Sequence, residues 1–230
     1  MILAIDTSTR YAGAALADAH RVIAGYCWYS SANHTAELMP AVAQMFQSKG
    51  LNPGELQGIA VALGPGGFSA LRVGISCTKG LALAWNKPIA GIETLELEAF
   101  PYLEAGLPVC ALLDAGRGEV ASALFGDGGH RSRDDLISTP DALLDSITEP
   151  TLFCGEGVTP WVQLIQERLG TRGLVVAHHT PATRLWSLVE LARRRLSIGD
   201  TDDLASLQPH YLRLPSIGSP KRRDRSPQQS

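Results

Sequence analysis

Short apolar runs separated by turn residues open the chain. Residues 2–5, 11–16 and 21–29 predict three strands that form a meander. After Asn33, apolar residues recur at i, i+1, i+4, i+7 and i+8, which is the spacing of one helical stripe, and Gly50 marks the end of that helix. The opening therefore predicts three strands followed by a helix over about 34–48.

A continuous apolar run over 58–63 follows, which is typical of a strand buried on both faces. It ends in the glycine-rich loop Gly64–Gly67, and a helix rich in small residues is predicted over 69–85. Residues 87–92 predict a further strand and residues 94–103 a further helix. The small side chains of the 69–85 helix would let another backbone approach it closely.

The second half of the chain repeats this order. The strand predicted over 108–114 ends in Asp114, as the first strand ends in Asp6, and a returning strand covers 119–125. The later elements also correspond: a strand over 151–154, a helix over 158–169, a strand over 174–177 and a helix over 182–196. Two copies of one strand-strand-strand-helix-strand-helix unit predict two similar α/β lobes with a cleft between them.

The repeat divides the chain into four parts. The expected bounds are 1–103 for an N-terminal lobe, 104–195 for a C-terminal lobe, 196–214 for a segment that returns to the first lobe, and 215–230 for a basic tail. The tail is rich in Ser, Pro and Gln, which cannot bury enough apolar area to fold, so we expect it to be disordered. The alternative interpretation is an electrostatic arm for RNA or an acidic partner.

Composition sets the remaining limits. With 45% hydrophobic and 19% charged residues over 230 positions, the chain is too apolar and too weakly charged to be disordered as a whole. Its apolar runs are shorter than the about 20 residues of a membrane-spanning helix, and its start lacks the basic region of a signal peptide. The four cysteines lack zinc-ligand spacing. We therefore expect a cytoplasmic protein with no membrane contact, no metal and no cofactor.

The formal net charge of −3 is unevenly distributed. Residues 216–230 contribute +3, so the remaining body carries −6. An acidic body gives no global reason for direct binding of nucleic acid.

The turns after the first strand of each half are candidates for chemistry. In Asp6-Thr7-Ser8 and in Asp114-Ala115-Gly116, a strand ends in an acid and a small turn follows. The backbone N–H groups of such a turn can hold phosphate oxygens, and the acid can hold Mg²⁺ or a water. Alternatively, each acid caps its own tight turn. Both interpretations stay open for Asp6, and the structural one is favoured for Asp114.

The glycine-rich loop precedes a helix, and a helix N-terminus attracts anions. The loop matches neither the dinucleotide fingerprint nor the P-loop, so a structural turn against a neighbouring backbone is favoured. The nucleotide or phosphate candidates in these places are Asp6, Thr7, Ser8, Gly64, Gly66 and Gly67. No histidine pair has helical i, i+4 spacing, and spacing reveals no Ser/His/acid or Cys/His cluster, so no catalytic residue is predicted.

Several motifs together resemble the TsaB (YeaZ) family. They are Ile2–Thr9, His34–Pro40, Gly64–Gly74, Lys79–Ala82, Asp114–Val120 and Pro209–Arg213. The resemblance covers about residues 1–214. It implies duplicated RNase H-like lobes of the actin/hexokinase/Hsp70 (ASKHA) superfamily.

The resemblance also implies a function. Members of this family are noncatalytic partners in making N6-threonylcarbamoyladenosine at position 37 of tRNAs that read ANN codons. The implied partners are the catalytic, metal-carrying paralogue TsaD and the ATPase TsaE, with tRNA reached only through the complex. A homodimer is implied when TsaD is absent.

Two departures from related motifs affect this expectation. The catalytic paralogue carries a His-x-x-x-His metal pair where this chain has Thr94 and Glu98, and a hydroxyl with a single carboxylate is a poor transition-metal pair compared with two imidazoles. We expect Glu98 on a solvated helix face. In the glycine loop, Gly67 and Ala70 replace the usual Ser and Gly, which argues against residual nucleotide binding.

The helices over 34–48 and 69–85 are the pairing surfaces that the resemblance implies. The candidate interface residues are His34, Leu38, Met39, Val42, Met45, Phe46, Leu71, Arg72 and Ile75. Methionine adapts well to exchangeable interfaces, and small residues suit close helix contacts. The alternative is that these residues form ordinary core stripes, as about half of them must, because each helix also packs on its own sheet.

Two other functions stay open on the sequence. A small-molecule kinase or ATPase of the same superfamily would need active phosphate loops at Asp6 and Asp114. A glycoprotease-like peptidase would need a nucleophile–base pair that the sequence does not show.

Overall fold

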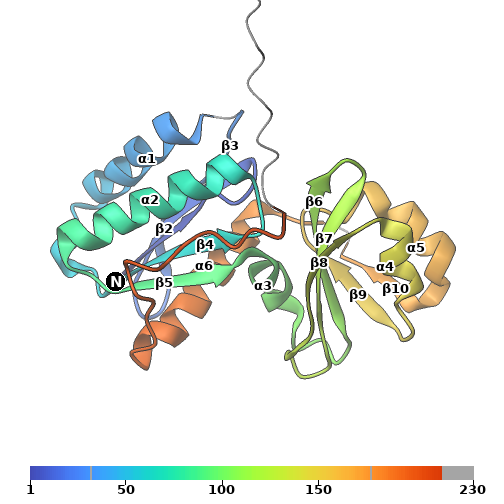
Figure 1. The fold of residues 1–230 in the computed structure, drawn as a ribbon. Helices are drawn as coiled ribbons and strands as arrows, with labels where there is room; N and C mark the ends of the chain where they lie inside the picture. The colour runs from blue at the N-terminus through green and yellow to red at the C-terminus, as the bar shows by residue number, and fades with distance from the viewer. Residues whose placement is uncertain (32, 177, 214–230) are drawn as a thin grey trace, which may run out of the picture.

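The computed structural model describes residues 1–31, 33–176 and 178–213, which form two lobes placed side by side (Figure 1). Each lobe contains one five-stranded sheet, in the orders β3-β2-β1-β4-β5 and β8-β7-β6-β9-β10. The identical topology of the two sheets confirms the internal duplication. In the described part of the chain, no helix combines the length and the apolar character that crossing a membrane requires.

The first sheet forms from the predicted meander and two parallel strands. Its strands are β1 (Ile2–Asp6), β2 (Tyr11–Ala17), β3 (Val22–Tyr29), β4 (Gly58–Gly64) and β5 (Ile89–Glu93). The central strand β1 pairs antiparallel with β2 and parallel with β4. Because β1 and β4 run in the same direction, the Asp6 turn and the Gly64–Gly67 loop emerge at the same end of the sheet.

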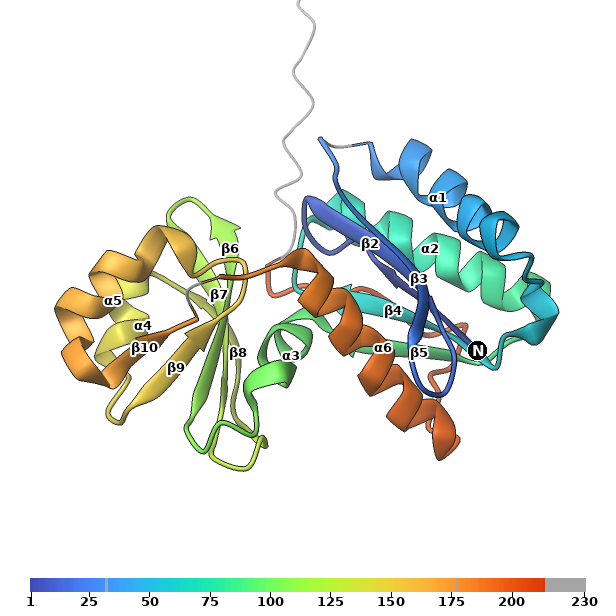
Figure 2. The same ribbon diagram turned by 180° about the vertical axis from the view of Figure 1, so that it is seen from behind.

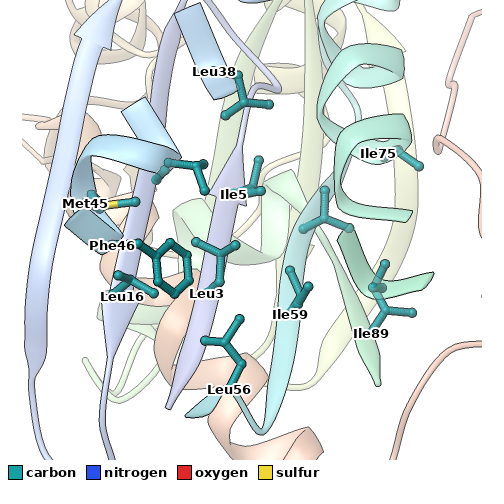
Figure 3. Packing of buried hydrophobic residues seen from close by; sticks show 14 residues of the cluster. Leu3, Ile5, Leu16, Leu38, Met45, Phe46, Leu56, Ile59, Ile75 and Ile89 are labelled. Carbon is teal, nitrogen blue, oxygen red and sulfur yellow. The ribbon is translucent and has the colours of Figure 1, made fainter. Parts of the chain in front are cut away.

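Helices α1 (His34–Lys49) and α2 (Phe68–Trp85) cover one face of this sheet, and a short 3₁₀ turn, η1 (Pro53–Glu55), follows α1. Figure 3 shows the core beneath them, where Leu38 of α1 lies toward Ile5 of the sheet and Phe46 lies toward Leu3 and Leu16. Gly50 ends α1 in the left-handed conformation, as the sequence predicts.

The second sheet contains β6 (Val109–Gly116), β7 (Glu119–Phe125), β8 (Arg131–Ser138), β9 (Thr151–Cys154) and β10 (Gly173–Val175). One face is covered by α4 (Pro140–Asp145) and α5 (Val162–Leu169), with the 3₁₀ turns η3 (Thr159–Trp161) and η4 (Gly170–Arg172) flanking α5. The sequence pattern does not locate β8 or α4. β8 is an edge strand whose charged residues obscure its alternation, and α4 is too short for a periodic signal.

Two helices contact the lobe that the other half of the chain forms. α3 (Thr94–Ala99), which continues as the 3₁₀ turn η2 (Phe100–Tyr102), lies between the lobes. It packs Leu95 and Ala99 against the second sheet and Leu97 into the core between the first sheet and α6. α6 (Pro181–Ser197) comes from the second half but packs against the first sheet. Figure 2 shows α3 at the junction between the lobes and α6 running from the junction along the first lobe.

The position of α6 corrects the expected extent 104–195 of the second lobe, because its last helix belongs to the first. The face of the first sheet opposite α1 and α2 is rich in alanine, with Ala4, Ala15, Ala60 and Ala62 buried against α6. Such small side chains allow a helix to approach closely, and Leu188 of α6 is buried completely against them.

The segment after α6 runs back along the first lobe. Asp202 forms an isolated bridge with Ile89 of β5, and the N–H of His210 donates to the carbonyl of Leu63 at 2.8 Å. Leu204 and Leu207 pack on the core beneath α1 and α2. The expected tail 215–230 lies outside the described residues.

Candidate functional site

The turn after β1 is held by its own acid. The backbone N–H and the hydroxyl of Ser8 both donate to Oδ1 of Asp6, at 2.8 and 2.6 Å. The hydroxyl of Thr7 donates to the carbonyl of Ala70 in α2 at 2.7 Å. All three turn residues are buried. One oxygen of Asp6 and the hydroxyls of Thr7 and Ser8 are therefore bound within the protein.

The second oxygen of Asp6 contacts Arg184, which α6 brings into the junction between the lobes. Nε of Arg184 donates to Oδ2 of Asp6 at 2.5 Å. Nη1 donates to Glu98 at 3.0 Å and to Glu156 at 2.9 Å. The side chain of Arg184 is completely buried. One guanidinium thus contacts three carboxylates.

The remaining nitrogen of the guanidinium binds the strand that follows the turn. Nη2 of Arg184 donates to the hydroxyl of Thr9 at 3.0 Å and to the carbonyl of Tyr11 at 2.8 Å. The Thr9 hydroxyl in turn donates to Glu156 at 2.7 Å. An arginine has five N–H donors, and the five acceptors around Arg184 match that number. We call Arg184, Asp6, Thr9, Glu98 and Glu156 the arginine cluster.

In the arginine cluster, burial and the neighbouring charges shift the pKa values of Glu98 and Arg184 in opposite directions. Burial raises the pKa of Glu98, whereas Arg184 and His179 act to lower it. Burial alone would lower the pKa of Arg184, but the three carboxylates raise it overall, so the guanidinium stays charged. Nδ1 of His179 lies 3.4 Å from Glu98.

The position of Glu98 differs from the one expected from the sequence. It does not lie on a solvated helix face but is 2% exposed, because α3 is inserted between the two lobes. Thr94, one turn earlier, is also buried, and its hydroxyl has no hydrogen-bond partner among the described residues. The two positions that align with the metal pair of the catalytic paralogue thus hold a hydroxyl and a carboxylate already bound to Arg184, so they do not fit a metal ion.

The glycine-rich loop packs directly on the Asp6 turn. The N–H of Gly67 donates to the carbonyl of Ser8 at 2.8 Å. A Cβ atom at Gly66 would lie 2.1 Å from the same carbonyl oxygen, so no larger residue fits there without a backbone shift. Gly64 has a φ of +108°, a conformation that glycine adopts readily. The structure therefore brings the two predicted phosphate segments together, but part of their hydrogen-bonding capacity is used internally.

The turn of the second half differs from that of the first. Asp114 is exposed, and its side chain accepts the N–H of Gly116 at 2.8 Å, as a turn cap does. It lies outside the arginine cluster but lines a cavity of about 410 Å³ between the lobes. Other lining residues of this cavity are Arg10, His34, Phe68, Ser69 and Glu156.

The structure separates the predicted interface residues into two groups. His34, Leu38, Val42, Met45, Phe46, Leu71 and Ile75 are buried within the first lobe, where α1 and α2 pack on the sheet. Six of these side chains lie within the lobe, and His34 also borders the cavity, so burial corrects the assignment of all seven to a partner surface. Met39 is 37% exposed, and Arg72 is also exposed. The guanidinium of Arg72 lies 3.9 Å from the Phe68 ring centroid, and its Nε donates to the Tyr211 hydroxyl at 3.1 Å.

Sequence reasoning missed Arg184, Glu156 and His179. A signal existed for Arg184, since it falls on the same helical stripe as the buried residues Leu188 and Ala192. A charged residue on a buried stripe indicates a buried partner. Which partner it meets could not be read from the sequence, because Asp6 lies 178 positions away.

Comparison with known proteins assigns the chain to a family. The model of the family described as TsaD, tRNA N6-adenosine threonylcarbamoyltransferase, matches residues 29–150. The tRNA threonylcarbamoyladenosine biosynthesis protein TsaB of Bacillus subtilis (strain 168) is 32% identical over 226 residues, covering 93% of this chain and 94% of that protein. The chain belongs to the TsaB family. Its members are named for tRNA threonylcarbamoyladenosine biosynthesis.

Solved structures agree with this family and its fold. YeaZ from Pseudomonas aeruginosa is 25% identical, with a TM-score of 0.72 over 92% of this chain and 99% of that one. Component A of (R)-2-hydroxyglutaryl-CoA dehydratase from Acidaminococcus fermentans is 8% identical with a TM-score of 0.52, covering 85% of this chain and 98% of that one, and shows the fold alone. The TsaB-family chain therefore has the duplicated two-lobed fold of the actin/hexokinase/Hsp70 superfamily.

Proposed function

We propose that this TsaB-family chain is a noncatalytic assembly subunit of the complex that makes N6-threonylcarbamoyladenosine at position 37 of tRNAs that read ANN codons. Its partner is a TsaD-like catalytic subunit, and a TsaE-like ATPase joins the complex. tRNA is reached only through the complex, and the chain pairs with itself when the TsaD-like subunit is absent. The protein acts in the cytoplasm.

The observation that carries this proposal is the arginine cluster. A superfamily enzyme needs free acids and free backbone donors in the cleft for a metal ion and phosphates. Here both oxygens of Asp6 accept hydrogen bonds from Ser8 and Arg184, and Glu98 accepts one from the same guanidinium. A cleft whose buried acids, Asp6 and Glu98, are bound internally favours a scaffold over a catalyst.

The outer sides of α1 and α2 supply a surface for the partner. We call their exposed residues the α1/α2 face, and they include Ala36, Met39, Pro40, Ala43, Arg72, Ser76, Gly80, Leu83 and Ala84. Most of these side chains are small or apolar, so the helices of a partner could approach closely. Leu83 is 73% exposed, which is costly for a side chain of this size in water. Pairing through this face would remove that cost.

Reconstitution with the TsaD-like subunit of the same organism tests the function. We expect the two proteins to co-purify and the modified nucleoside to form in tRNA only when both are present with the ATPase. Full modification activity without this chain would contradict the assembly role.

A pair of matched variants tests the interface. Met39→Glu places a charge on the α1/α2 face, whereas Leu174→Glu changes a side chain of similar exposure, 39%, on strand β10 of the other lobe. We expect the first variant to weaken co-purification at least tenfold and the second to leave it unchanged. Equal effects of both variants would show that the partner does not use this face.

The kinase or ATPase alternative makes a different prediction. It requires ATP hydrolysis by the isolated chain, with turnover abolished by Asp6→Ala. The peptidase alternative would need a nucleophile–base pair. Cys154 does not fit the nucleophile of such a pair, because burial raises the pKa of this thiol well above its ordinary value and its Sγ donates to the carbonyl of Glu98. Robust ATP turnover dependent on Asp6 would overturn the noncatalytic assignment.

A further inference from the structure

We propose that Arg184 is a built-in cation that occupies a latent metal position between the lobes, so that removing its guanidinium creates a site for a divalent cation. The latent ligands are the carboxylates of Glu98 and Glu156 and the imidazole of His179. Arg184 would have this role whether or not the chain assembles with a TsaD-like partner.

The geometry of the three groups supports a single bound cation. One ligand atom from each of Glu98, Glu156 and His179 lies within 4.8 Å of the other two. Nη1 of Arg184 donates to both carboxylates, at 3.0 and 2.9 Å, so a positive group already bridges two of the three ligands. The third ligand, His179, lies with Nδ1 3.4 Å from Glu98. Carboxylates and imidazole are oxygen and nitrogen ligands that suit ions such as Mn²⁺.

The burial of the cluster supports the same conclusion. Glu98 and Asp6 are buried and Arg184 is completely buried, whereas Glu156 is partly exposed. Several carboxylates gathered away from water repel one another unless a cation balances them. In the wild type, the positive charge comes from Arg184, which α6 supplies to the cluster. Without it, the carboxylates would have an unbalanced negative charge that a divalent ion could neutralise.

The same arrangement recurs at a second place. The described residues contain one other His and carboxylate group of this spacing, formed by Glu93, Asp135 and His210. Arg131 forms ion pairs with both of its carboxylates. Both groups with metal-like spacing among the described residues therefore already contain an arginine, which indicates that this chain neutralises its clustered acids with internal guanidinium groups.

The arginine cluster also joins the two lobes. Asp6 and Thr9 belong to the first sheet and its turn, Glu156 follows β9 of the second sheet, and Arg184 contacts all three. Glu98 lies on α3 at the junction. A guanidinium that binds groups from both lobes holds them at a fixed spacing, as a shared ion would.

Titration with Mn²⁺ tests the proposal directly. The full-length wild type and the Arg184→Ala variant are first treated with a chelator, and free Mn²⁺ is then followed by electron paramagnetic resonance. We expect Arg184→Ala to bind one Mn²⁺ at least 100-fold more tightly than the wild type does. In the double variants Arg184→Ala/Glu98→Gln and Arg184→Ala/Glu156→Gln, we expect this gain to fall at least tenfold. Arg184→Ala/Asp145→Asn changes an exposed acid on α4 and should keep the gain.

Folding provides a second readout in case Arg184→Ala is unstable. Mn²⁺ should raise the thermal midpoint of Arg184→Ala, or allow it to refold from urea, and should have neither effect on the Glu98→Gln double variant. Arg184→Gln, which removes the charge but keeps an amide donor, repeats both measurements. The proposal is overturned if neither single variant gains Mn²⁺ affinity or Mn²⁺-dependent stability over the wild type, or if the wild type binds Mn²⁺ equally tightly through Glu98.

Discussion

Two glycines on one helix provide a sharp test of how the Asp6 turn is held. Gly74 and Gly80 both lie inside α2. A Cβ atom at Gly74 would lie 2.3 Å from Oγ1 of Thr7, whereas a Cβ atom at Gly80 would meet nothing within 4 Å. Replacement of either glycine by alanine adds the same helix propensity, about 0.8–1.0 kcal/mol. The two variants therefore differ in the contact with the turn.

The two substitutions should change the free energy of unfolding in opposite directions. Gly80→Ala should raise the free energy of unfolding by about 1 kcal/mol. Gly74→Ala should force Thr7 to move, and overpacking of a close-packed site costs about 1–3 kcal/mol. The hydrogen bond from Thr7 to the carbonyl of Ala70, 2.7 Å long and buried, would break, which costs about a further 1–2 kcal/mol. After the gain in propensity, we expect Gly74→Ala to be destabilised by about 1–4 kcal/mol.

Urea titration followed by circular dichroism measures both effects, with an unchanged slope as the check that the unfolded states are comparable. Thr7→Ala removes Oγ1, so the cost of Gly74→Ala should shrink in a Thr7→Ala background. Equal stability of Gly74→Ala and Gly80→Ala would refute the close packing of the turn on α2. So would a double variant in which the cost of Gly74→Ala is undiminished.

Three further outcomes are expected. Arg184→Met in metal-free buffer should lower the free energy of unfolding by about 3–5 kcal/mol, because it leaves buried carboxylates unpaired. A urea midpoint equal to that of the wild type would show that the arginine cluster does not stabilise the fold. Burial lowers the pKa of His34 below 6.5, so the folded state binds fewer protons than the unfolded one. The stability that depends on neutral His34 is therefore present above about pH 6.5 and is lost as the pH falls. Melting temperatures between pH 7.5 and 5.5 should therefore fall less for His34→Gln than for the wild type. Asp202→Ala removes the acceptor for the N–H of Gly91, 2.7 Å away, and should destabilise the chain by about 1–3 kcal/mol in thermal unfolding; no loss would mean that this contact does not anchor the C-terminal segment.

Much of the fold could be predicted from residue patterns. The meander of strands, the helices α1 and α2 and the correspondence of the two halves follow from local periodicity and from glycine at the turns. The 94–103 helix is shorter than predicted, because Pro101 cannot continue it and the chain passes into η2. β8 escaped prediction because an edge strand need not show an apolar face.

The candidate site was less accessible to sequence reasoning. Asp6 was recognised as a candidate, but whether its carboxylate is free or bound depends on Arg184, far along the chain. The sequence of α3 is compatible with either a solvated or a buried position of Glu98. Glu98 is buried because α3 is inserted between the lobes. The apolar stripe of α1 could face a partner or its own sheet, and the structure assigns it to the sheet.

The sequence by itself determined the duplicated units and the family, because both depend on local patterns and on the order of motifs along the chain. Only the tertiary structure decided the position of α3 between the lobes, the packing of α6 on the first sheet and the contact of Arg184 with three carboxylates. The physical reason is that a buried charge is stable only when its partners surround it in space, and those partners come from segments with no regular spacing in the sequence.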